Sequence, residues 1–124
     1  MSRVRGRDTK PELFVRSLVH RLGFRFRLHG KFLPGKPDLV FASKRKVVFV
    51  HGCFWHSHAH CKRARTPSSN REYWESKLAR NRKRDSQNRR AITNLGWSSL
   101  VIWECQTNHP EALAGLLLDF LEHV

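Results

Sequence analysis

A short apolar segment that ends in a cluster of histidines and cysteines constrains this 124-residue chain more than any other feature. Residues 47–50, Val-Val-Phe-Val, are apolar without interruption, as is typical of a central strand covered on both faces. Residues 51–61 follow at once and hold four of the eight histidines and two of the three cysteines. The pattern therefore predicts a buried strand that leads directly into a metal site, a catalytic site or both.

Length and charge limit the class of protein. The chain is long enough for one domain with one core, and 40% hydrophobic residues are enough to fold it. A formal net charge of +14 favours a polyanionic partner, usually nucleic acid, with a basic ribosomal or membrane-surface protein as the alternative. The sequence has no apolar run of the roughly 20 residues that span a bilayer and no signal peptide at its start. We therefore expect no membrane partner and a cytoplasmic, nucleoid-associated protein.

Hydrophobic periodicity predicts helices and strands in the order αβββαβα. Helices are expected at residues 9–22, 69–95 and 110–121. Strands are expected at residues 24–28, 38–42, 46–51 and 97–103. Thr9 and Ser69 each begin a capping-box pattern, and Gly23 and Gly96 are the expected helix stops. Helices that alternate with a central sheet predict one α/β or α+β domain at residues 9–124, preceded by a basic arm at residues 1–8.

Asp38 is a candidate magnesium ligand. It begins the second strand, directly after the turn at residues 34–37, and a carboxylate there can hold Mg²⁺ through oxygen. An isolated Asp at the start of a strand is more often a turn former. The neighbouring strand ends at His51, however, and the two side chains are expected to converge. His56 follows in the loop and is a natural general base near pH 7.

The cysteines indicate a structural metal. Three thiols and one imidazole suit Zn²⁺, and the spacing C-x4-H-x2-C with one downstream cysteine provides four ligands: Cys53, His58, Cys61 and Cys105. His60 or His109 can take the place of the histidine in this set. A buried core thiol is the alternative interpretation of Cys105.

Basic and aromatic side chains indicate contact with DNA. Few local carboxylates balance the basic residues, although a solvated charged face is the usual interpretation of such a run. The expected phosphate contacts are Lys62, Arg63, Arg65, Lys77, Arg80 and Arg84. Phe54, Trp55 and Trp74 adjoin this surface, as the wedges of a DNA-bending protein would. Core packing is the alternative, which we expect for Trp97 and Trp103.

Six segments in this order closely resemble the very short patch repair (Vsr) DNA mismatch endonucleases: Leu33-Pro34-Gly35-Lys36-Pro37-Asp38, Val50-His51-Gly52-Cys53-Phe54-Trp55-His56, Glu72-Tyr73-Trp74-Glu75-Ser76-Lys77, Asn81 with Arg84-Asp85, Gly96-Trp97 and Val101-Ile102-Trp103-Glu104-Cys105. The match covers roughly residues 3–105. The resemblance implies the restriction-endonuclease-like fold, related to the PD-(D/E)xK nucleases, with a mixed central sheet flanked by helices. It also implies a monomer that nicks double-stranded DNA 5′ to the thymine of a T:G mismatch, with other mismatch-repair factors as further partners.

The resemblance also implies roles for single residues. Asp38 is the expected principal Mg²⁺ ligand, and Val50 offers its backbone carbonyl to the metal. His51 supports the hydrated metal, His56 acts as the base toward water, and Glu12 reaches the site from the first helix. This chain has Val50 where the well-known member of the family has Thr, so a backbone contact survives and a hydroxyl contact does not.

Zinc and DNA contacts follow from the same resemblance. The zinc ligands are Cys53, His58, Cys61 and Cys105. The aromatic wedge enters from the major-groove side and consists of Phe54, Trp55 and Trp74. The arm, with Arg3 and Arg5, approaches the minor groove; it is shorter than in better-known members, so weaker mismatch affinity is expected.

Two other functions are weighed against mismatch nicking. A non-catalytic, zinc-stabilised module that recognises distorted DNA needs the same charge, zinc ligands and aromatic wedge, but needs neither Asp38 nor His51 and His56. A nuclease of the same fold with a different site specificity shares every one of these features.

Overall fold

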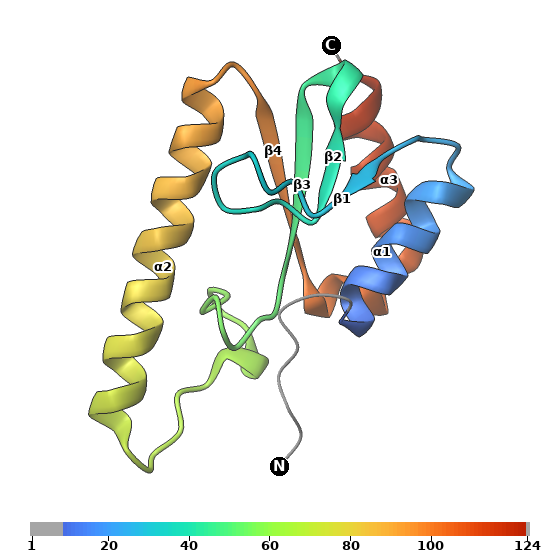
Figure 1. Ribbon diagram of the computed structural model, residues 1–124. Helices are drawn as coiled ribbons and strands as arrows, with labels where there is room; N and C mark the ends of the chain where they lie inside the picture. Colours follow the sequence, from blue (N-terminus) through green and yellow to red (C-terminus); the bar gives the residue numbers. More distant parts are fainter. Residues whose placement is uncertain (1–8, 124) are drawn as a thin grey trace.

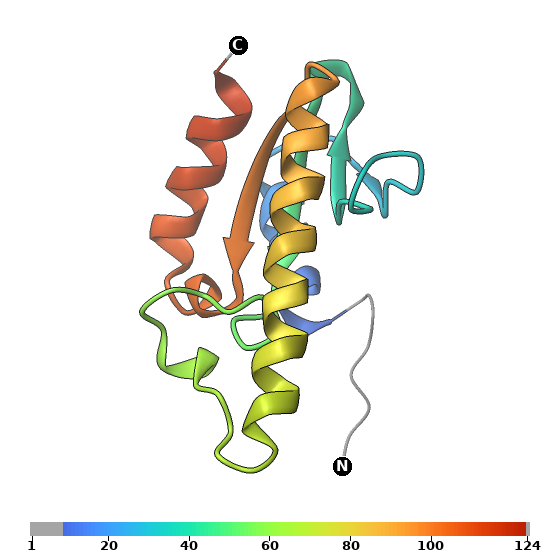
Figure 2. The same ribbon diagram turned by 90° about the vertical axis from the view of Figure 1, so that its left-hand side faces the viewer.

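The computed structural model describes residues 9–123, which form a small single α/β domain. Its helices are α1 (Lys10–Arg21), α2 (Arg71–Asn94) and α3 (Pro110–Glu122). Its strands are β1 (Arg27–Leu28), β2 (Leu39–Phe41), β3 (Lys46–His51) and β4 (Ser98–Trp103). They form a mixed sheet in the order β1-β2-β3-β4, with α1 and α3 on one face and α2 on the other (Figures 1 and 2).

β3 lies inside the sheet and is covered on both faces, which confirms the expectation from its apolar sequence. Val48 belongs to a core cluster that also includes side chains of α1 and α3. Val47 and Phe49 point the other way, into a second cluster with Ile92 of α2. Alternating side chains along one strand thus join the two helical layers through the sheet.

The two neighbours of β3 determine what meets at its end. β2 pairs with β3 antiparallel through a short turn, whereas β4 pairs with it parallel after the long crossover through α2. In this register His51 lies opposite Trp103, the last residue of β4. The start of β2, the end of β3 and the end of β4 therefore lie at the same end of the sheet.

Capping and apolar spacing explain the shorter helices. Thr9 caps α1, since its hydroxyl accepts from the backbone N–H of Glu12 at 3.4 Å, and a proline lies in the first turn. α3 buries Leu113, Leu117 and Leu121 at four-residue spacing. None of the helices within residues 9–123 is long and apolar enough to cross a membrane.

Several local predictions were wrong at element ends. Ser69 does not cap α2. The N-cap residue is Asn70, which has a left-handed backbone (φ 54°) and not the extended backbone of a residue whose side chain caps a helix. The helix predicted at residues 69–95 begins at Arg71 and ends at Asn94, with Leu95 as its C-cap residue. The first strand shrinks to two residues, and Leu28 is 42% exposed because β1 is an edge strand. Three short 3₁₀-helices were not predicted, at Ala42–Lys44, Lys62–Ala64 and Glu104–Asn108.

Candidate catalytic pocket and zinc centre

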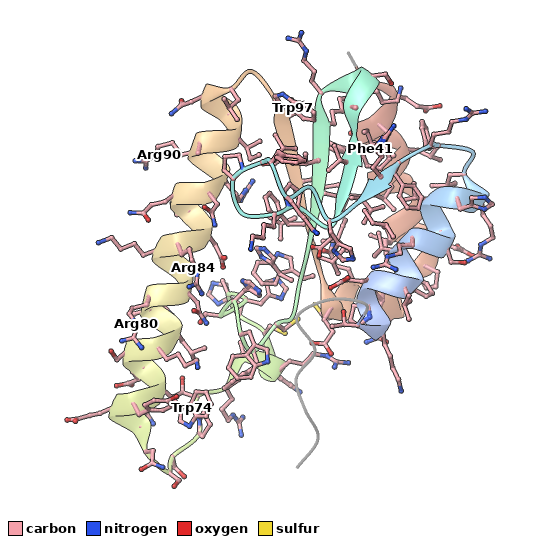
Figure 3. The ribbon with its side chains drawn as sticks, in the orientation of Figure 1. Phe41, Trp74, Arg80, Arg84, Arg90 and Trp97 are labelled. Atoms are coloured by element: carbon pink, nitrogen blue, oxygen red, sulfur yellow. The ribbon has the colours of Figure 1, made fainter. Side chains whose placement is uncertain are left out.

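A cavity of about 280 Å³ opens where the start of β2 and the end of β3 face α2. Glu12 reaches it from α1, Asp38 from the residue before β2, and Asp85 from the middle of α2. His51 and His56 complete the polar part of its wall. Five polar groups from four separate parts of the chain thus come together beside the middle of α2, where Arg84 is labelled in Figure 3.

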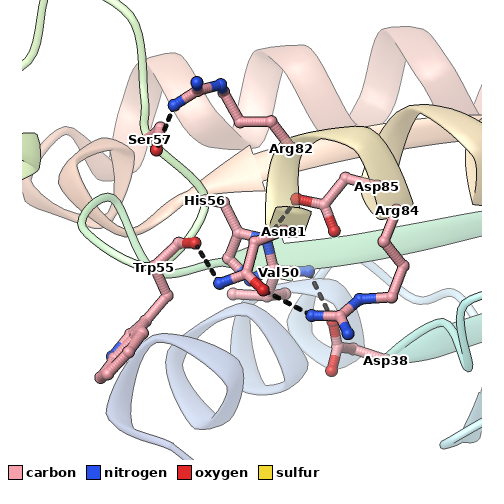
Figure 4. A network of polar contacts seen from close by, with 9 residues as sticks. All are labelled: Asp38, Val50, Trp55, His56, Ser57, Asn81, Arg82, Arg84 and Asp85. Atoms are coloured by element: carbon pink, nitrogen blue, oxygen red, sulfur yellow. Dashed lines mark hydrogen bonds and ion pairs between the residues drawn. The ribbon is translucent and has the colours of Figure 1, made fainter. Parts of the chain in front are cut away.

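The acidic side of the cavity holds two carboxyl groups and one imidazole. Ligand atoms of Glu12, His29 and Asp38 all lie within 4.8 Å of one another. Arg16 donates to Glu12 at 3.3 Å and to the Nε2 atom of His29 at 3.1 Å. The Val50 backbone N–H donates to Asp38 Oδ2 at 2.6 Å, which orients that carboxyl group (Figure 4).

The surroundings of Asp38 disfavour its charged form. Its pKa is raised to about 7, mainly by burial and also by the nearby Glu12 carboxylate, against the opposing effects of the Val50 N–H and Arg16. Glu12 itself is only 3% exposed. Two buried carboxyl groups at this separation favour a cation between them, because a divalent ion removes both the repulsion and the cost of burial. The donor set therefore fits a hard divalent metal.

The opposite side of the cavity is a histidine pair joined to an aspartate. The rings of His51 and His56 stack at 3.8 Å with an interplanar angle of 7°. His56 Nδ1 donates to Asp85 Oδ2 at 2.6 Å (Figure 4). A carboxylate can only accept, so this contact leaves His56 Nε2 as the free basic nitrogen when the ring is neutral.

His51 is held neutral. Its pKa is lowered to about 4, mainly by burial and also by the neighbouring His56. Its side chain is 7% exposed, and its Nδ1 has no hydrogen-bond partner among residues 9–123. A buried polar atom of this kind calls for a partner such as a bound water or ion. His51 is therefore a candidate to orient hydrated metal.

α2 positions the loop that carries His56. Asn81 donates to the backbone carbonyl of Trp55 at 3.1 Å, and Arg84 donates to Asn81 Oδ1 at 2.6 Å (Figure 4). Arg82, the residue after Asn81, donates to Ser57 Oγ at 3.1 Å. These contacts place the loop on the helix that also supplies Asp85. Part of the basic middle of α2 thus has a structural role in addition to the predicted contact with phosphate.

The structure brings the four predicted zinc ligands together. Ligand atoms of Cys53, His58, Cys61 and Cys105 all lie within 4.8 Å of one another, and His60 and His109 are outside this group. Burial raises the pKa of the Cys53 thiol to about 12, so a metal is needed to hold it as thiolate. Three sulfurs and one imidazole nitrogen at this spacing fit tetrahedral Zn²⁺.

Residues around this cluster orient its ligands. The Cys105 backbone N–H donates to Cys53 Sγ at 3.4 Å, and the His58 ring stacks on Trp103 at 4.2 Å. Glu104 accepts from the Cys53 backbone N–H at 3.4 Å. Contacts of this type hold metal ligands in position in proteins. Trp103, predicted only as a core residue, therefore also packs on a candidate zinc ligand.

The predicted aromatic wedge forms a cluster at the start of α2. The Phe54 ring lies 5.1 Å from Trp55 and 5.4 Å from Trp74, and the two tryptophan rings lie 5.8 Å apart. Lys77 Nζ lies 5.7 Å from the Trp55 ring centroid. Tyr73, which the sequence analysis left without a role, adds an edge contact to Trp74. All of these side chains are partly or mostly exposed, unlike core aromatics.

The predicted phosphate contacts within the described residues come from two segments, residues 62–65 and α2. Arg63 pairs with Glu104 at 3.5 Å, and Arg80 donates to Ser76. Lys62 and Arg65 line a separate cavity beside the zinc ligands. This segment and the loop before β2 project from opposite sides of α2 (Figure 2). The predicted contacts Arg3 and Arg5 lie outside the described residues.

Sequence reasoning missed the partner of His56. Asp85 was noted only as part of a motif, and neither His29 nor Arg16 was considered as part of the site. One signal was available: Asp85 is the only acid among the otherwise basic and neutral residues 76–94. A single acid within such a basic helix indicates a specific partner. His29 gave no comparable signal, because only the pairing of β1 with β2 brings it beside Asp38.

Comparison with known proteins agrees with this chemistry. The family model for the DNA mismatch endonuclease Vsr matches residues 1–63. A type II nicking enzyme, V.XorIIP, of Xanthomonas oryzae pv. oryzae is 47% identical over 98% of this chain and 89% of its own length. The DNA mismatch endonuclease Vsr of Escherichia coli is 39% identical over 91% of this chain and 72% of its own length.

These relationships define the class of protein first: the chain is a DNA endonuclease, and DNA is its substrate. A nuclease of this kind implies a divalent metal requirement. More particularly, the chain belongs to the Vsr family of DNA mismatch endonucleases.

Proposed function

We propose that this endonuclease nicks one strand of double-stranded DNA 5′ to the thymine of a T:G mismatch, in a Mg²⁺-dependent reaction. One observation carries the proposal: the Asp38–Glu12 pair and the His56–Asp85 pair face the same cavity. Cation ligands on one side and a base on the other are the two parts that hydrolysis of a phosphodiester needs. We propose the restriction-endonuclease-like fold for the domain that holds this cavity.

Asp38, supported by Glu12, would hold the metal. Bound Mg²⁺ would neutralise charge on the phosphodiester and lower the pKa of bound water. The Val50 N–H donates to Asp38, and the N–H and carbonyl of one strand residue point toward the same neighbouring strand. This supports the Val50 carbonyl as a further ligand. Val50 lacks the side-chain hydroxyl of the Thr found in the well-known family member, but a contact made by the backbone carbonyl does not need that hydroxyl.

His56 would act as the base toward the attacking water. Asp85 fixes the ring through Nδ1, so the lone pair of Nε2 can accept a proton. His51 lies flat against this ring and stays neutral near pH 7, so it adds no charge beside the metal. Its buried Nδ1 would bond to water held around the metal. Hydrolysis would leave 5′-phosphate and 3′-hydroxyl ends.

Zinc and the aromatic cluster would prepare the site for distorted DNA. A closed site of Cys53, His58, Cys61 and Cys105 would hold both ends of the loop that carries Phe54 and Trp55. A rigid loop lets these rings and Trp74 enter a stack without first losing their own conformational freedom. The arm at residues 1–8 would add minor-groove contacts through Arg3 and Arg5.

A nicking assay on T:G, U:G and matched duplexes, with and without Mg²⁺, tests this proposal. Cleavage of the T:G duplex alone, only with Mg²⁺ and only 5′ to thymine, is the expected result. Binding of all three duplexes with no cleavage in any metal would indicate the non-catalytic zinc module instead. Cleavage of matched DNA at the same rate would indicate a nuclease of different site specificity.

A further inference from the structure

We propose that Phe32 is a second aromatic DNA contact, which packs against the DNA strand that occupies the catalytic pocket. It would act on the opposite side of that pocket from Phe54, Trp55 and Trp74. The inference rests on the proposed catalytic pocket, since that pocket determines where the DNA lies. It does not depend on mismatch specificity or on the identity of the metal.

The exposure of Phe32 is exceptional within this molecule. The side chain is 100% exposed, whereas the other seven phenylalanines are buried or partly buried. Single exposed apolar residues are ordinary on protein surfaces. A whole aromatic ring in water is a stronger signal, particularly next to a site that must bind nucleobases and sugars.

Backbone hydrogen bonds and one apolar contact support the loop that carries Phe32. Its base is closed by hydrogen bonds from His29 N–H to Asp38 O at 3.1 Å and from Gly30 N–H to Pro37 O at 2.9 Å. Two successive turns follow, with Leu33 N–H donating to Gly30 O and Lys36 N–H donating to Leu33 O, both at 3.1 Å. Leu33, next to Phe32, packs against the apolar cluster of Val40, Val47, Phe49 and Ile92. The structured loop therefore presents the Phe32 ring to solvent.

The same loop forms one wall of the catalytic pocket. Gly35 and Lys36 line the cavity beside Asp38. Gly35 has φ +77°, and a Cβ there would meet Asn88 of α2 at 2.9 Å and Phe49 at 3.0 Å. Only glycine allows this close approach of the loop to α2. A DNA strand that reaches Asp38 must therefore pass beside the loop.

Shape and charge select DNA as the partner. The loop projects outward beside α2, whereas the labelled Trp74 lies toward the other end of that helix (Figures 2 and 3). Lys31, next to Phe32 in sequence, and Lys36, in the same loop, are both exposed, and Lys36 has a left-handed backbone (φ 49°). An exposed aromatic ring on a loop that also carries two lysines can contact a base or deoxyribose while the lysines approach phosphates. Two aromatic contacts, one on each side of the pocket, would hold a bent strand across Asp38.

Binding of a fluorescent T:G duplex to the zinc-loaded full chain, without added Mg²⁺, provides the test. Phe32→Ala should weaken binding about 5- to 100-fold, the range expected for loss of one stacking contact. Phe32→Tyr should bind as the parent does, because it keeps the ring. The matched control is Leu95→Ala, which removes another exposed apolar side chain, at the C-terminal end of α2, and should leave binding unchanged.

Salt dependence separates stacking from charge. Phe32→Ala should leave the slope of log affinity against log salt unchanged, whereas Lys31→Ala should reduce it by about 1. Parental affinity of Phe32→Ala, with an unchanged unfolding temperature, would overturn the proposal. Equal loss of affinity in Phe32→Ala and Leu95→Ala would overturn it as well.

Nicking by an Asp38 variant distinguishes failure of the catalytic proposal from failure of the Phe32 proposal. If Asp38→Asn nicks DNA at the parental rate while Phe32→Ala still weakens binding, the role of Asp38 is wrong and the Phe32 contact stands. If Asp38→Asn is inactive and Phe32→Ala binds normally, the catalytic pocket stands and the Phe32 contact is wrong.

Discussion

The zinc cluster and the catalytic pocket share one loop but are assembled in different ways. Three of the four zinc ligands lie within residues 53–61, and the fourth follows β4 directly. The polar groups of the pocket come instead from α1, the start of β2, the end of β3 and the middle of α2. The first site is mostly local in sequence, whereas the second exists only when the sheet and both helical layers have formed.

A continuous row of four aromatic rings in contact connects the two sites. His56 stacks on His51 at 3.8 Å, the His51 ring meets the edge of Trp103 at 5.3 Å, and Trp103 stacks on His58 at 4.2 Å. A candidate base and a candidate zinc ligand are therefore three packed contacts apart. This arrangement predicts that the pocket depends on the zinc site more than the zinc site depends on the pocket.

The largest expected effect isolates the pocket. Asp38→Asn should reduce nicking to background, since the amide is neutral and a poor ligand for Mg²⁺. Zinc content by elemental analysis and the unfolding temperature should stay at parental values or above, because a repelled, buried carboxylate is removed. Parental nicking by this variant would contradict the assignment of Asp38.

Cys105→Ala should affect both regions. Loss of one ligand should release zinc and cost about 4 kcal/mol or more in the free energy of unfolding. Nicking should fall as well, because the loop with His56 loses the contact between the Cys105 thiol and His58. Elemental analysis and thermal unfolding measure the two effects. A zinc content equal to the parent's would exclude Cys105 as a ligand.

Asp85→Asn should lower kcat about 10- to 100-fold, as expected when a residue that orients a catalytic group is altered. The amide keeps the shape of the side chain but can donate to His56 Nδ1, which favours the wrong tautomer. KM for DNA and zinc content should not change. His56→Ala should cost more than Asp85→Asn; the reverse order would place the base elsewhere.

Trp103→Leu tests the connection between the regions. It removes the ring contacts to both His51 and His58, each of which is worth about 0.5–1.5 kcal/mol beyond burial. We expect a lower unfolding temperature, weaker zinc retention against a chelator and slower nicking, each by a modest amount. Unchanged nicking in a variant with weakened zinc retention would show that the two sites act independently.

The smallest effect is expected for Arg63→Ala. Its partner Glu104 is also partly exposed, at 3.5 Å, and such pairs contribute about 0–1 kcal/mol. Zinc content should stay the same, and DNA affinity should fall only slightly. A large loss of affinity, measured by fluorescence anisotropy, would show that the segment beside the zinc site contacts DNA directly.

Patterns within one segment predicted much of this molecule. The apolar run before His51 predicted a strand buried on both faces, and hydrophobic periodicity predicted the last helix. Errors arose where the environment of an element decides the outcome. Leu28 has the right spacing for burial but lies on an edge strand, and Ser69 has the right capping pattern but precedes a left-handed Asn70.

The sequence by itself determined the elements, the grouping of the potential zinc ligands and the resemblance that led to a DNA endonuclease. These features depend on spacing along the chain, which side-chain periodicity and ligand geometry translate directly into structure. Only the tertiary structure decided that His56 meets Asp85, that His29 joins Asp38 and Glu12, and that Phe32 stands in solvent beside the pocket. The physical reason is that such contacts join residues far apart in sequence, and sheet pairing and helix packing alone bring them within a few ångströms.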